Sequence, residues 1–333
     1  MAILVNSINV VEAHERIARW IQKTPCVLDP LLSEKLGAQI FLKLENLQRT
    51  GSFKERGALN KLLLLNESEK HFGVVTASAG NHAQAVAYHA TQLGIKAVIF
   101  MPEHAPQIKV KHTRILGGEV YVHGENYDEA HEAALKYSLE SGAFYLHAYN
   151  DTSVIAGQGT VGLEILEQLP QVDLILCPVG GGGLISGIAV ALENQPIRMM
   201  GVQSESMPSM KRALDLNRGP IKLPPTQTFA DGIRVRRVGD LTYAICKQLV
   251  SEWKLVSEPA IARAMLHLLE ESKTVTEGAG AIALAPVLEQ QLSDIRGKTI
   301  CVIVSGGNID LKLESRKSGQ MARLVLTLNE ALG

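Results

Sequence analysis

A lysine at the predicted start of a helix is the first residue whose type and position could support covalent chemistry. Lys54 lies in the segment Ser52–Gly57, which reads SFKERG. Ser52 is the expected N-cap of a helix that runs from Lys54 to Leu65. The positive end of the helix dipole disfavours an ammonium group there, so a partly buried Lys54 loses its proton readily, as a Schiff-base lysine must. An isolated lysine is more often an ordinary surface residue, so other motifs must support this interpretation.

A run of glycines supplies a second element of chemistry. The segment Gly180–Gly187 reads GGGGLISG and follows a predicted strand. Four residues without side chains at a helix start present backbone N–H groups to a phosphate, which the helix dipole also attracts. A tight turn alone needs fewer glycines, since each costs about 1 kcal/mol of chain entropy. The dinucleotide pattern G-x-G-x-x-G matches poorly, because Ile185 or Ser186 fills its third position and Glu205 lies beyond the next strand.

Two further loops carry polar groups at the ends of predicted strands. In Ser78–Gln84, which reads SAGNHAQ, Asn81 can hydrogen-bond a ring oxygen while the loop N–H groups receive a carboxylate. Simple N-capping by Ser78 or Asn81 would explain this loop equally well, and a lone histidine such as His82 is usually structural. In Ser305–Asn308, the serine could donate a hydrogen bond to a heterocycle nitrogen, although a strand-terminating turn is the simpler explanation.

These loops must be positioned by alternating strands and helices. Short apolar, β-branched runs alternate with helix-period segments, which predicts an α/β fold with mostly parallel sheets. In such sheets, ligands bind at the carboxyl ends of the strands, where these loops lie. We expect a small domain at 71–151 inside a large domain formed by 1–70 and 152–333, and a surface loop at Pro220–Pro225. The predicted strands are Gln39–Leu44, Gly73–Ser78, Lys96–Met101, Glu119–His123, Ala143–His147, Leu174–Val179, Met199–Ser204 and Thr299–Ser305.

Composition narrows the class of partner. The 333 residues carry 33 Lys and Arg against 34 Asp and Glu, a formal charge of -1. Such a balance gives no electrostatic footprint for nucleic acid or an anionic membrane, so a small molecule is the expected partner. The N-terminal apolar run is too short for a signal peptide, and the cytoplasm is the expected location. The cysteines, which we expect to be reduced and mostly in the core, are Cys26, Cys177, Cys246 and Cys301.

The four loops together resemble the serine/threonine dehydratase family of fold type II pyridoxal-phosphate (PLP) enzymes. Their order and spacing agree over nearly the whole chain. The stretches Val154–Thr160, Phe229–Gly232 and Thr276–Gly280 are similar to the short, catabolic type of threonine dehydratase. The resemblance implies a two-lobed architecture like that of the tryptophan synthase β chain, with helices flanking a mostly parallel sheet in each lobe.

The same resemblance assigns roles to individual residues. It implies that Lys54 holds PLP as a Schiff base and is the catalytic base, with Ser305 facing the ring nitrogen. The ring contacts come from Phe53 and Asn81. The residues implied for the cofactor phosphate are Gly180, Gly181, Gly182, Gly183 and Leu184. Those implied for the substrate are Ser78, Ala79, Gly80, Asn81 and His82.

The activity implied is β-elimination from L-threonine, giving 2-oxobutanoate and ammonia, and from L-serine, giving pyruvate. Serine racemases are also similar, but they carry a serine at the position of Ala79, and alanine cannot move a proton. A hydroxyaspartate ammonia-lyase is a further alternative, although Glu129 stands where the racemase has an arginine for a second carboxylate. From other classes, we keep an NAD-dependent oxidoreductase and a non-catalytic nucleotide sensor as alternatives.

Regulation and assembly are further expectations from the resemblance. Short catabolic threonine dehydratases are often activated by AMP, and the matching positions here are Arg49, Thr50, Gln84 and Asn308. The segment Arg114–Gly117 departs from the catabolic pattern at two other nucleotide contacts, which leaves AMP control open. Only Glu205 is acidic where the racemase binds a divalent metal, so no metal site is assigned. A homodimer or homotetramer is expected.

Overall fold

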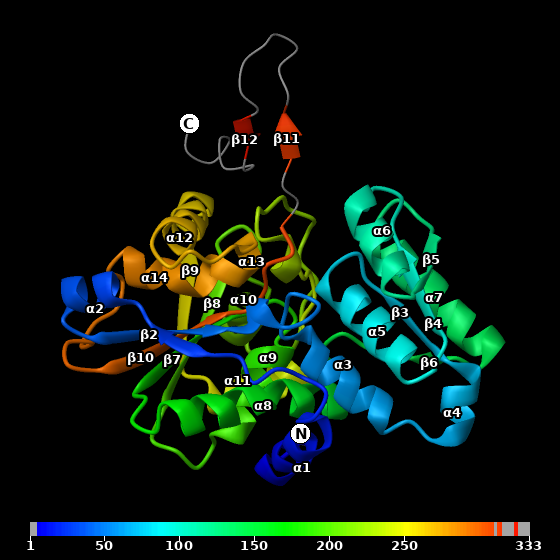
Figure 1. Cartoon of the computed structure of the whole chain (residues 1–333), viewed down its shortest axis with the longest axis horizontal. Helices are drawn as coiled ribbons and strands as arrows, with labels where there is room; N and C mark the ends of the chain where they lie inside the picture. Colours follow the sequence, from blue (N-terminus) through cyan, green and yellow to red (C-terminus); the bar gives the residue numbers. More distant parts are fainter. Residues whose placement is uncertain (1–4, 310–311, 315–322, 326–333) are drawn as a thin grey trace.

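Two sheets, standing side by side in Figure 1, form the frame of the chain. The computed structural model describes residues 5–309, 312–314 and 323–325. The larger sheet has the order β1-β2-β10-β7-β8-β9 and is parallel except for β1 against β2. Its strands are β1 (Cys26–Leu28), β2 (Gln39–Leu44), β7 (Leu174–Pro178), β8 (Arg198–Ser204), β9 (Glu252–Val256) and β10 (Thr299–Val304).

The smaller sheet is entirely parallel, with the order β5-β4-β3-β6. Its strands are β3 (Val74–Ala77), β4 (Ala97–Met101), β5 (Glu119–Val122) and β6 (Phe144–Tyr145). A separate antiparallel pair is formed by β11 (Lys312–Glu314) and β12 (Arg323–Val325).

Helices cover both faces of the larger sheet, because its strands alternate buried apolar side chains between two cores. Along β10, Ile300 and Val302 join one cluster, whereas Cys301 and Ile303 join the other. On the first face pack α2 (Pro30–Leu36), α12 (Glu258–Glu270), α13 (Gly278–Ala281), η3 (Ile282–Leu284) and α14 (Ala285–Leu288). On the second face pack α8 (Thr152–Gln168), α9 (Gly183–Ala191), α10 (Ser209–Leu216) and α11 (Asp240–Leu249), and α1 (Ser7–Ile17) packs against α8.

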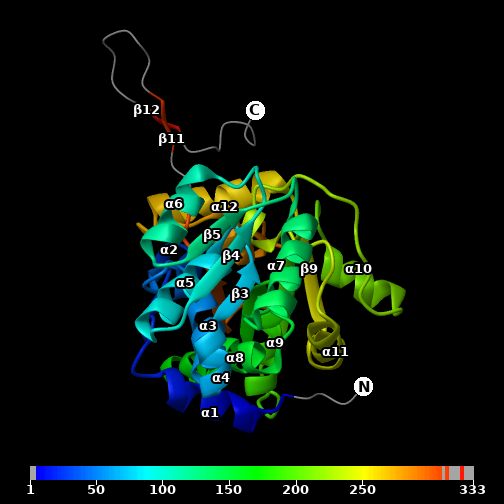
Figure 2. The same cartoon turned by 90° about the vertical axis from the view of Figure 1, so that its right-hand side faces the viewer.

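The smaller sheet is sandwiched in the same way, with α5 on one side and α7 on the other (Figure 2). The α5 side also receives apolar residues of α3 and α6, so α3 connects this core to the larger sheet. The helices around this sheet are α3 (Lys54–Leu63), α4 (Glu67–Phe72), α5 (Asn81–Gln92), α6 (Gln107–Ile115) and α7 (Tyr127–Ser141).

All eight predicted strands are present, most of them shorter by a residue or two at an end, because the terminal residues belong to the turns. Two strands of the larger sheet, β1 and β9, were not predicted. Both are edge strands, and most of their residues are at least partly exposed, so neither has the continuous apolar run of a buried parallel strand. The predicted division at 71–151 stays a prediction.

The predicted cap of the Lys54 helix is wrong. Helix α3 starts at Lys54, but its N-cap is Phe53, and no side chain caps it. Ser52 is fully buried and instead pairs with Gly306 in an isolated antiparallel bridge to the end of β10. The helix ends at Leu63, because Asn66 caps the next helix, α4. The backbone of the Ser52 loop is thus fixed by the larger sheet.

Four buried charged side chains form a closed network between β2, α3, α8 and η1 (Glu45–Leu47). Arg56 binds Glu45 and Glu164 with contacts of 2.7 to 2.8 Å, and Lys43 Nζ lies 2.6 Å from Glu164. All four side chains are at most 2% exposed. Burial opposes ionisation of Glu45, but the charge and hydrogen bonds of Arg56 outweigh it and hold the pKa of Glu45 below its ordinary value.

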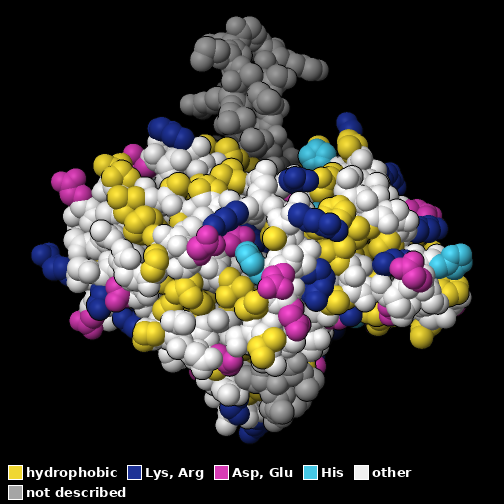
Figure 3. Space-filling view, turned by 60° about the horizontal axis from the view of Figure 1, so that its bottom comes forward, with side chains coloured by type: hydrophobic (Ala, Val, Ile, Leu, Met, Phe, Trp, Pro, Cys, Tyr) yellow, Lys and Arg dark blue, Asp and Glu magenta, His cyan; other side chains and the backbone are white. Residues whose placement is uncertain are grey.

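The surface and the cysteines agree with the sequence expectations. On the face shown in Figure 3, basic and acidic side chains are interspersed among apolar ones. Residues 220–225 contain no helix or strand and are largely exposed, as predicted. All four cysteines are free; Cys26 is half-buried and the other three are buried. Within the described ranges, no helix is long and apolar enough to cross a membrane.

Candidate cofactor and substrate site

The four predicted loops meet at the carboxyl ends of the strands. Phe53 N donates to Ser305 O at 3.2 Å, and Asn308 Nδ2 donates to Asn81 Oδ1 at 2.8 Å. These bonds join the Lys54 loop, the residues that follow β10 and the Asn81 loop. The glycine loop reaches the same place through Tyr149, whose ring lies against Gly181. The structure therefore brings all four sequence motifs together around one place.

Lys54 is the first residue of α3, at the positive end of the helix dipole. Its Nζ donates a hydrogen bond to Ala148 O at 3.0 Å and lies 5.2 Å from the centre of the Phe53 ring. Burial lowers the pKa of Lys54 to about 8, because the ammonium form is poorly solvated there. A lysine with this pKa has a substantial neutral fraction near neutrality, which nucleophilic and basic roles both require.

The glycine loop fits a phosphate. Gly182 has a φ of 96°, in the left-handed region, and α9 starts at Gly183. None of the N–H groups from Gly180 to Leu184 has an acceptor among the described residues, although Gly181 to Leu184 are buried. Five neighbouring buried or half-buried donors without acceptors at a helix start match what a phosphate needs. The residues predicted to hold the cofactor phosphate therefore fit that group.

Close packing also explains two of these glycines. A Cβ on Gly181 would lie 2.4 Å from the ring of Tyr149, and one on Gly182 would lie 2.7 Å from Met210 and 2.8 Å from Thr242. Thr242 Oγ1 also donates to Gly181 O at 2.6 Å. The loop is thus held by close packing and by the hydrogen bond from Thr242.

The Ser78–Gln84 loop presents further N–H groups. Helix α5 starts at Asn81 with Gly80 as its N-cap, and no side chain caps it, so the capping alternative for Ser78 and Asn81 is wrong. Ser78 Oγ instead accepts from Gly80 N at 3.2 Å. The N–H groups of Ala79, Asn81 and His82 have no acceptor among the described residues. A Cβ on Gly80 would meet no atom within 4 Å, so this part of the loop borders open space.

His82 has the properties of a neutral structural histidine. Its side chain is 3% exposed, and its Nε2 lies 3.2 Å from Leu146 O. Burial, with a contribution from the charge of Lys54, lowers the pKa of His82 to about 3. A group with this pKa does not take up a proton at neutral pH, so its place in the site is as a neutral neighbour of Lys54.

Ser305 lies at the end of β10 and is 4% exposed. Its Oγ is 3.2 Å from Ala279 O, to which it donates. Because a serine hydroxyl can rotate, the same Oγ can instead donate toward a ring nitrogen. A neutral hydroxyl in this position does not hold a proton on that nitrogen as a carboxylate would.

Two side chains of the site carried no predicted role. Glu277 is 5% exposed and accepts from Asn81 Nδ2 at 2.5 Å, while Tyr149 packs on the glycine loop. Burial, with the charge of Asp231 adding to it, raises the pKa of Glu277 to about 7. Glu277 stands in a stretch already noted for its resemblance, and Tyr149 follows β6 just as the other loops follow their strands. Their positions in the sequence could therefore have indicated that both residues belong to the site.

Three of the four residues matched to a nucleotide have hydrogen-bond contacts near the Lys54 loop or on α5. Thr50 O accepts from Asn308 Nδ2 at 2.7 Å, and the buried Thr50 Oγ1 has no hydrogen-bond partner among the described residues. Arg49 is exposed, and its Nη1 lies 3.4 Å from the hydroxyl of Tyr88. Tyr88 is four residues after Gln84 on α5, so both point from the same side of that helix.

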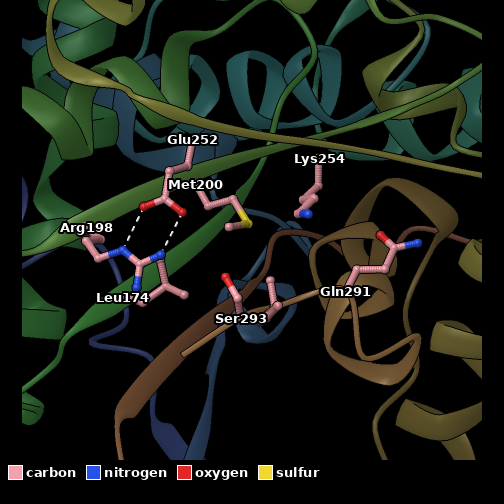
Figure 4. A pocket seen from close by; sticks show the side chains of 8 residues that line it. Leu174, Arg198, Met200, Glu252, Lys254, Gln291 and Ser293 are labelled. Carbon is pink, nitrogen blue, oxygen red and sulfur yellow. Dashed lines mark hydrogen bonds and ion pairs between the residues drawn. The ribbon is translucent and has the colours of Figure 1, made fainter. Parts of the chain in front are cut away.

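A separate surface pocket lies at the other end of the larger sheet (Figure 4). Its lining includes Leu174, Arg198 and Glu252, which start or nearly start β7, β8 and β9. Arg198 and Glu252 pair through two hydrogen bonds of 2.7 and 2.8 Å. This pocket is far from the four loops and takes no part in the site. Within the described part of the chain, no group of three or more acidic, His or Cys side chains could hold a metal.

Comparison with curated proteins identifies several close relatives. The chain is 48% identical over 310 residues to the L-threonine ammonia-lyase of Thermotoga maritima, which covers 92% of this chain and 77% of that protein. It is 45% identical over 315 residues to the catabolic L-threonine dehydratase TdcB of Escherichia coli strain K12, covering 93% and 95%.

Solved structures give the same result. Maize serine racemase superimposes with a TM-score of 0.88 at 37% identity, covering 92% of this chain and 94% of that one. The processed form of threonine deaminase isoform 2 from Solanum lycopersicum superimposes with a TM-score of 0.86 at 36% identity, covering 93% and 89%. These neighbours confirm the predicted fold type II architecture and the predicted family resemblance.

The family model described as pyridoxal-phosphate dependent enzyme matches residues 17–306, which include three of the loops in full and Ser305 and Gly306 of the fourth. This match accounts for Lys54, for the unpaired N–H groups of Gly180–Leu184 and for Ser305 at one place, and it favours PLP over NAD. The chain belongs to the pyridoxal-phosphate dependent enzyme family.

Proposed function

We propose that this chain catalyses the PLP-dependent β-elimination of L-threonine to 2-oxobutanoate and ammonia, and of L-serine to pyruvate. The observation that carries the proposal is Lys54, a half-buried lysine with a pKa of about 8 among donor loops that fit a phosphate and a carboxylate. Relatives at 43 to 48% identity that are named for threonine support the substrate. The reaction balances, since the water lost by elimination is regained on hydrolysis.

Each residue has a task that its surroundings support. When bound, PLP withdraws electrons from the substrate and so weakens its Cα–H bond. Lys54, released by the incoming amine, takes the Cα proton at its Nζ. The N–H groups of Ala79, Asn81 and His82 receive the substrate carboxylate, and those of Gly180–Leu184 hold the cofactor phosphate. Ser305 would contact the ring nitrogen, and its neutral hydroxyl would not hold a proton there, which would favour fast elimination over transamination.

Racemisation is the neighbouring activity that structural similarity alone would allow. It needs a second group that moves a proton on the opposite face of the substrate, and the side chain of Ala79 cannot do so. For hydroxyaspartate, a cation would have to receive the second carboxylate. Glu129 is acidic, and its two oxygens already accept from Glu125 N at 2.8 Å and Asn126 Nδ2 at 2.6 Å. Both observations favour elimination from threonine and serine.

AMP activation, assembly and domain limits complete the proposal. Thr50, Gln84 and Asn308 lie close to Asn81 and the Lys54 loop, so a nucleotide bound beside them would contact elements that position the catalytic lysine. Arg49 supplies an exposed cation for the phosphate of that nucleotide.

We also propose that the protein forms a homodimer or homotetramer and lies in the cytoplasm. We propose that residues 1–70 and 152–333 form the large domain and residues 71–151 the small one.

The test begins with the absorption spectrum of the purified protein. We expect a yellow protein with a band near 410 nm that borohydride removes. Lys54→Ala should lose this band, and its formation of 2-oxobutanoate from threonine should fall by roughly 10⁴-fold, since the positioned base is gone. Lys61→Met, a nearby lysine on the same helix, is the control and should keep the band.

A colourless wild-type protein that binds NAD would overturn the proposal. Assays of threonine, serine and hydroxyaspartate in parallel determine the substrate preference. The same threonine assay at low substrate, with and without AMP, tests activation, and an unchanged apparent affinity would remove that part.

A further inference from the structure

Glu277 is a buried carboxyl group to which the proposed reaction gives no role. Its Oε1 accepts from Asn81 Nδ2 at 2.5 Å, and its backbone N–H donates to Gly306 O at 3.3 Å. A Cβ on Gly306 would lie 2.4 Å from that Oε1 and 3.0 Å from Asn81 Nδ2. The contact between Glu277 and Asn81 is therefore packed directly on the residue after Ser305, beside the predicted position of the cofactor ring.

The hydrogen bonds fix which way the Asn81 amide points. An ionised Glu277 can only accept, so it selects the Nδ2 end of Asn81. At the other end, Oδ1 accepts from Asn308 Nδ2 at 2.8 Å, and that nitrogen also donates to Thr50 O at 2.7 Å. One N–H of Asn81 Nδ2 is used by Glu277, and the second stays available for a ligand.

We propose that Glu277 is a positioning residue that directs the second N–H of Asn81 toward the ring oxygen of bound PLP. This inference rests on the proposed cofactor site. A carboxylate acceptor also polarises the amide, which strengthens the remaining N–H as a donor. Glu277 touches neither substrate nor cofactor in this arrangement and acts only through Asn81.

The charges around Glu277 make this positioning depend on pH. Burial and the charge of Asp231, on η2 (Asp231–Ile233), raise its pKa to about 7, while the Asn81 hydrogen bond and Lys109, on α6, oppose the rise. Lys109 and Asp231 also form an ion pair with each other. Glu277 is thus ionised above pH 7, where it holds the amide firmly, and neutral below it, where the hold weakens.

The first experiment measures PLP affinity in place of turnover. The apo-protein of Glu277→Gln is titrated with PLP at pH 8, and binding is followed by protein fluorescence. We expect the dissociation constant to rise about tenfold, because a glutamine can turn its own NH₂ toward Asn81 and reverse that amide. An unchanged dissociation constant would overturn the inference.

Glu258→Gln is the matched control. Glu258 accepts from Ser204 Oγ at 2.6 Å, Thr228 Oγ1 at 2.9 Å and Phe229 N at 2.9 Å, and it does not contact Asn81. The Glu258→Gln variant should have a lower melting temperature than the wild type, while its PLP affinity should stay within twofold of the wild-type value. A purely structural Glu277 would behave as Glu258 does, with a lower melting temperature and normal PLP affinity.

A pH series keeps the inference testable if Glu277→Gln does not fold. The dissociation constant of PLP is measured between pH 6 and 9 in variants that retain Glu277. Asp231→Asn removes the like charge and frees Lys109, so the acid-side loss of affinity should move to lower pH. Lys109→Met should move it to higher pH. Shifts in the same direction, or none, would contradict the role of Glu277.

Failure of this inference is distinguishable from failure of the proposed function. If Lys54→Ala retains the 410 nm band, the cofactor site itself is wrong. If that band is lost but Glu277→Gln binds PLP as tightly as the wild type, the site stands and only the positioning role is wrong. The double variant Asp231→Asn with Glu277→Gln should show no further pH shift, as two residues acting through one group require.

Discussion

Two regions of this protein bury charged groups in opposite ways. The network of Lys43, Glu45, Arg56 and Glu164 contains two cations and two anions, and each contacts at least one opposite charge. In the cofactor site, Lys54 meets only a neutral carbonyl oxygen and Glu277 only a neutral amide at hydrogen-bonding distance, among the described residues. Arg56 holds the pKa of Glu45 below its ordinary value, whereas burial shifts the pKa of Lys54 and the pKa of Glu277 toward neutrality.

The difference separates architecture from reactivity. A buried ion pair keeps its groups in one protonation state, so it can hold elements together but cannot exchange protons near neutral pH. A buried lysine or carboxyl group without an opposite charge has its pKa moved toward neutrality, as a catalytic or switching group requires. The two regions share helix α3, in which Lys54 and Arg56 are only two residues apart.

Arg56→Met removes the arginine that contacts both carboxylates of the buried charged network. Of the changes considered, it should have the largest effect on stability. Its removal leaves Glu45 and Glu164 with Lys43 as the remaining buried cation, so the free energy of unfolding should fall by about 3 to 5 kcal/mol. Urea denaturation of the variant and of the wild type measures this fall in the free energy of unfolding. Adding Glu45→Gln to this variant should restore part of the loss, since one uncompensated charge is removed. A loss below about 1 kcal/mol would mean that the network contributes little.

Lys54→Met, studied in the apo-protein, measures how much an amine without an opposite charge costs in stability. The pKa of Lys54 is about 8 in the folded chain and 10.5 for an unperturbed lysine, so the unfolded state binds more protons between these values. The cost of this buried amine is therefore fully present below pH 8 and disappears as the pH rises toward 10.5. The variant should be more stable than wild type by up to ~3 kcal/mol at pH 7.

This gain should vanish near pH 10.5, as urea denaturation at both pH values would show. The exposed Lys23, which pairs with Glu167 on the surface, is the control, and Lys23→Met should change stability by less than about 1 kcal/mol. A less stable Lys54→Met at pH 7 would mean that the bond to Ala148 outweighs the cost of burial.

Ser305→Asp should have the smallest effect and tests the neutrality of the site itself. An aspartate would keep the ring nitrogen of bound PLP protonated, which strengthens electron withdrawal and favours transamination. Elimination should fall by roughly tenfold, about 1.4 kcal/mol, while transaminase side activity rises. Product analysis with threonine and an added 2-oxo acid measures the partition, and Ser305→Ala serves as the uncharged control. An unchanged partition would count against this role of Ser305.

Much of this arrangement could be predicted from the sequence. Eight strands were predicted, and six of them (β2, β3, β4, β7, β8 and β10) are inner strands, in which burial on both faces of the sheet leaves a clear apolar pattern. The sequence also indicated that the loops with Lys54, the glycine run and Ser305 would meet, and the roles of these residues stay predictions. What the pattern does not contain is long-range pairing. The edge strands β1 and β9, the Ser52 bridge to Gly306 and the contact of Glu277 with Asn81 depend on neighbours far away in the chain.

The absence of long-range pairing from the sequence pattern also explains why the predicted N-cap, Ser52, was wrong. Ser52 has the right type and spacing for an N-cap, but the end of β10 pairs with its backbone and leaves α3 without a capping side chain. Local preference was overridden by a tertiary contact, and the result leaves the first-turn N–H groups of the lysine helix without a local side-chain acceptor.

The open space at Gly80 matters for anyone who wishes to redesign the substrate preference of this enzyme. Gly181, Gly280 and Gly306 are closed to larger residues, since a Cβ on any of them would come within 2.4 Å of a neighbouring atom. Gly80 borders no atom within 4 Å and has a φ of -134°, which other residues adopt. A combinatorial library that varies position 80 together with Ala79 can therefore change the shape offered to the amino-acid side chain without disturbing the backbone that holds the cofactor.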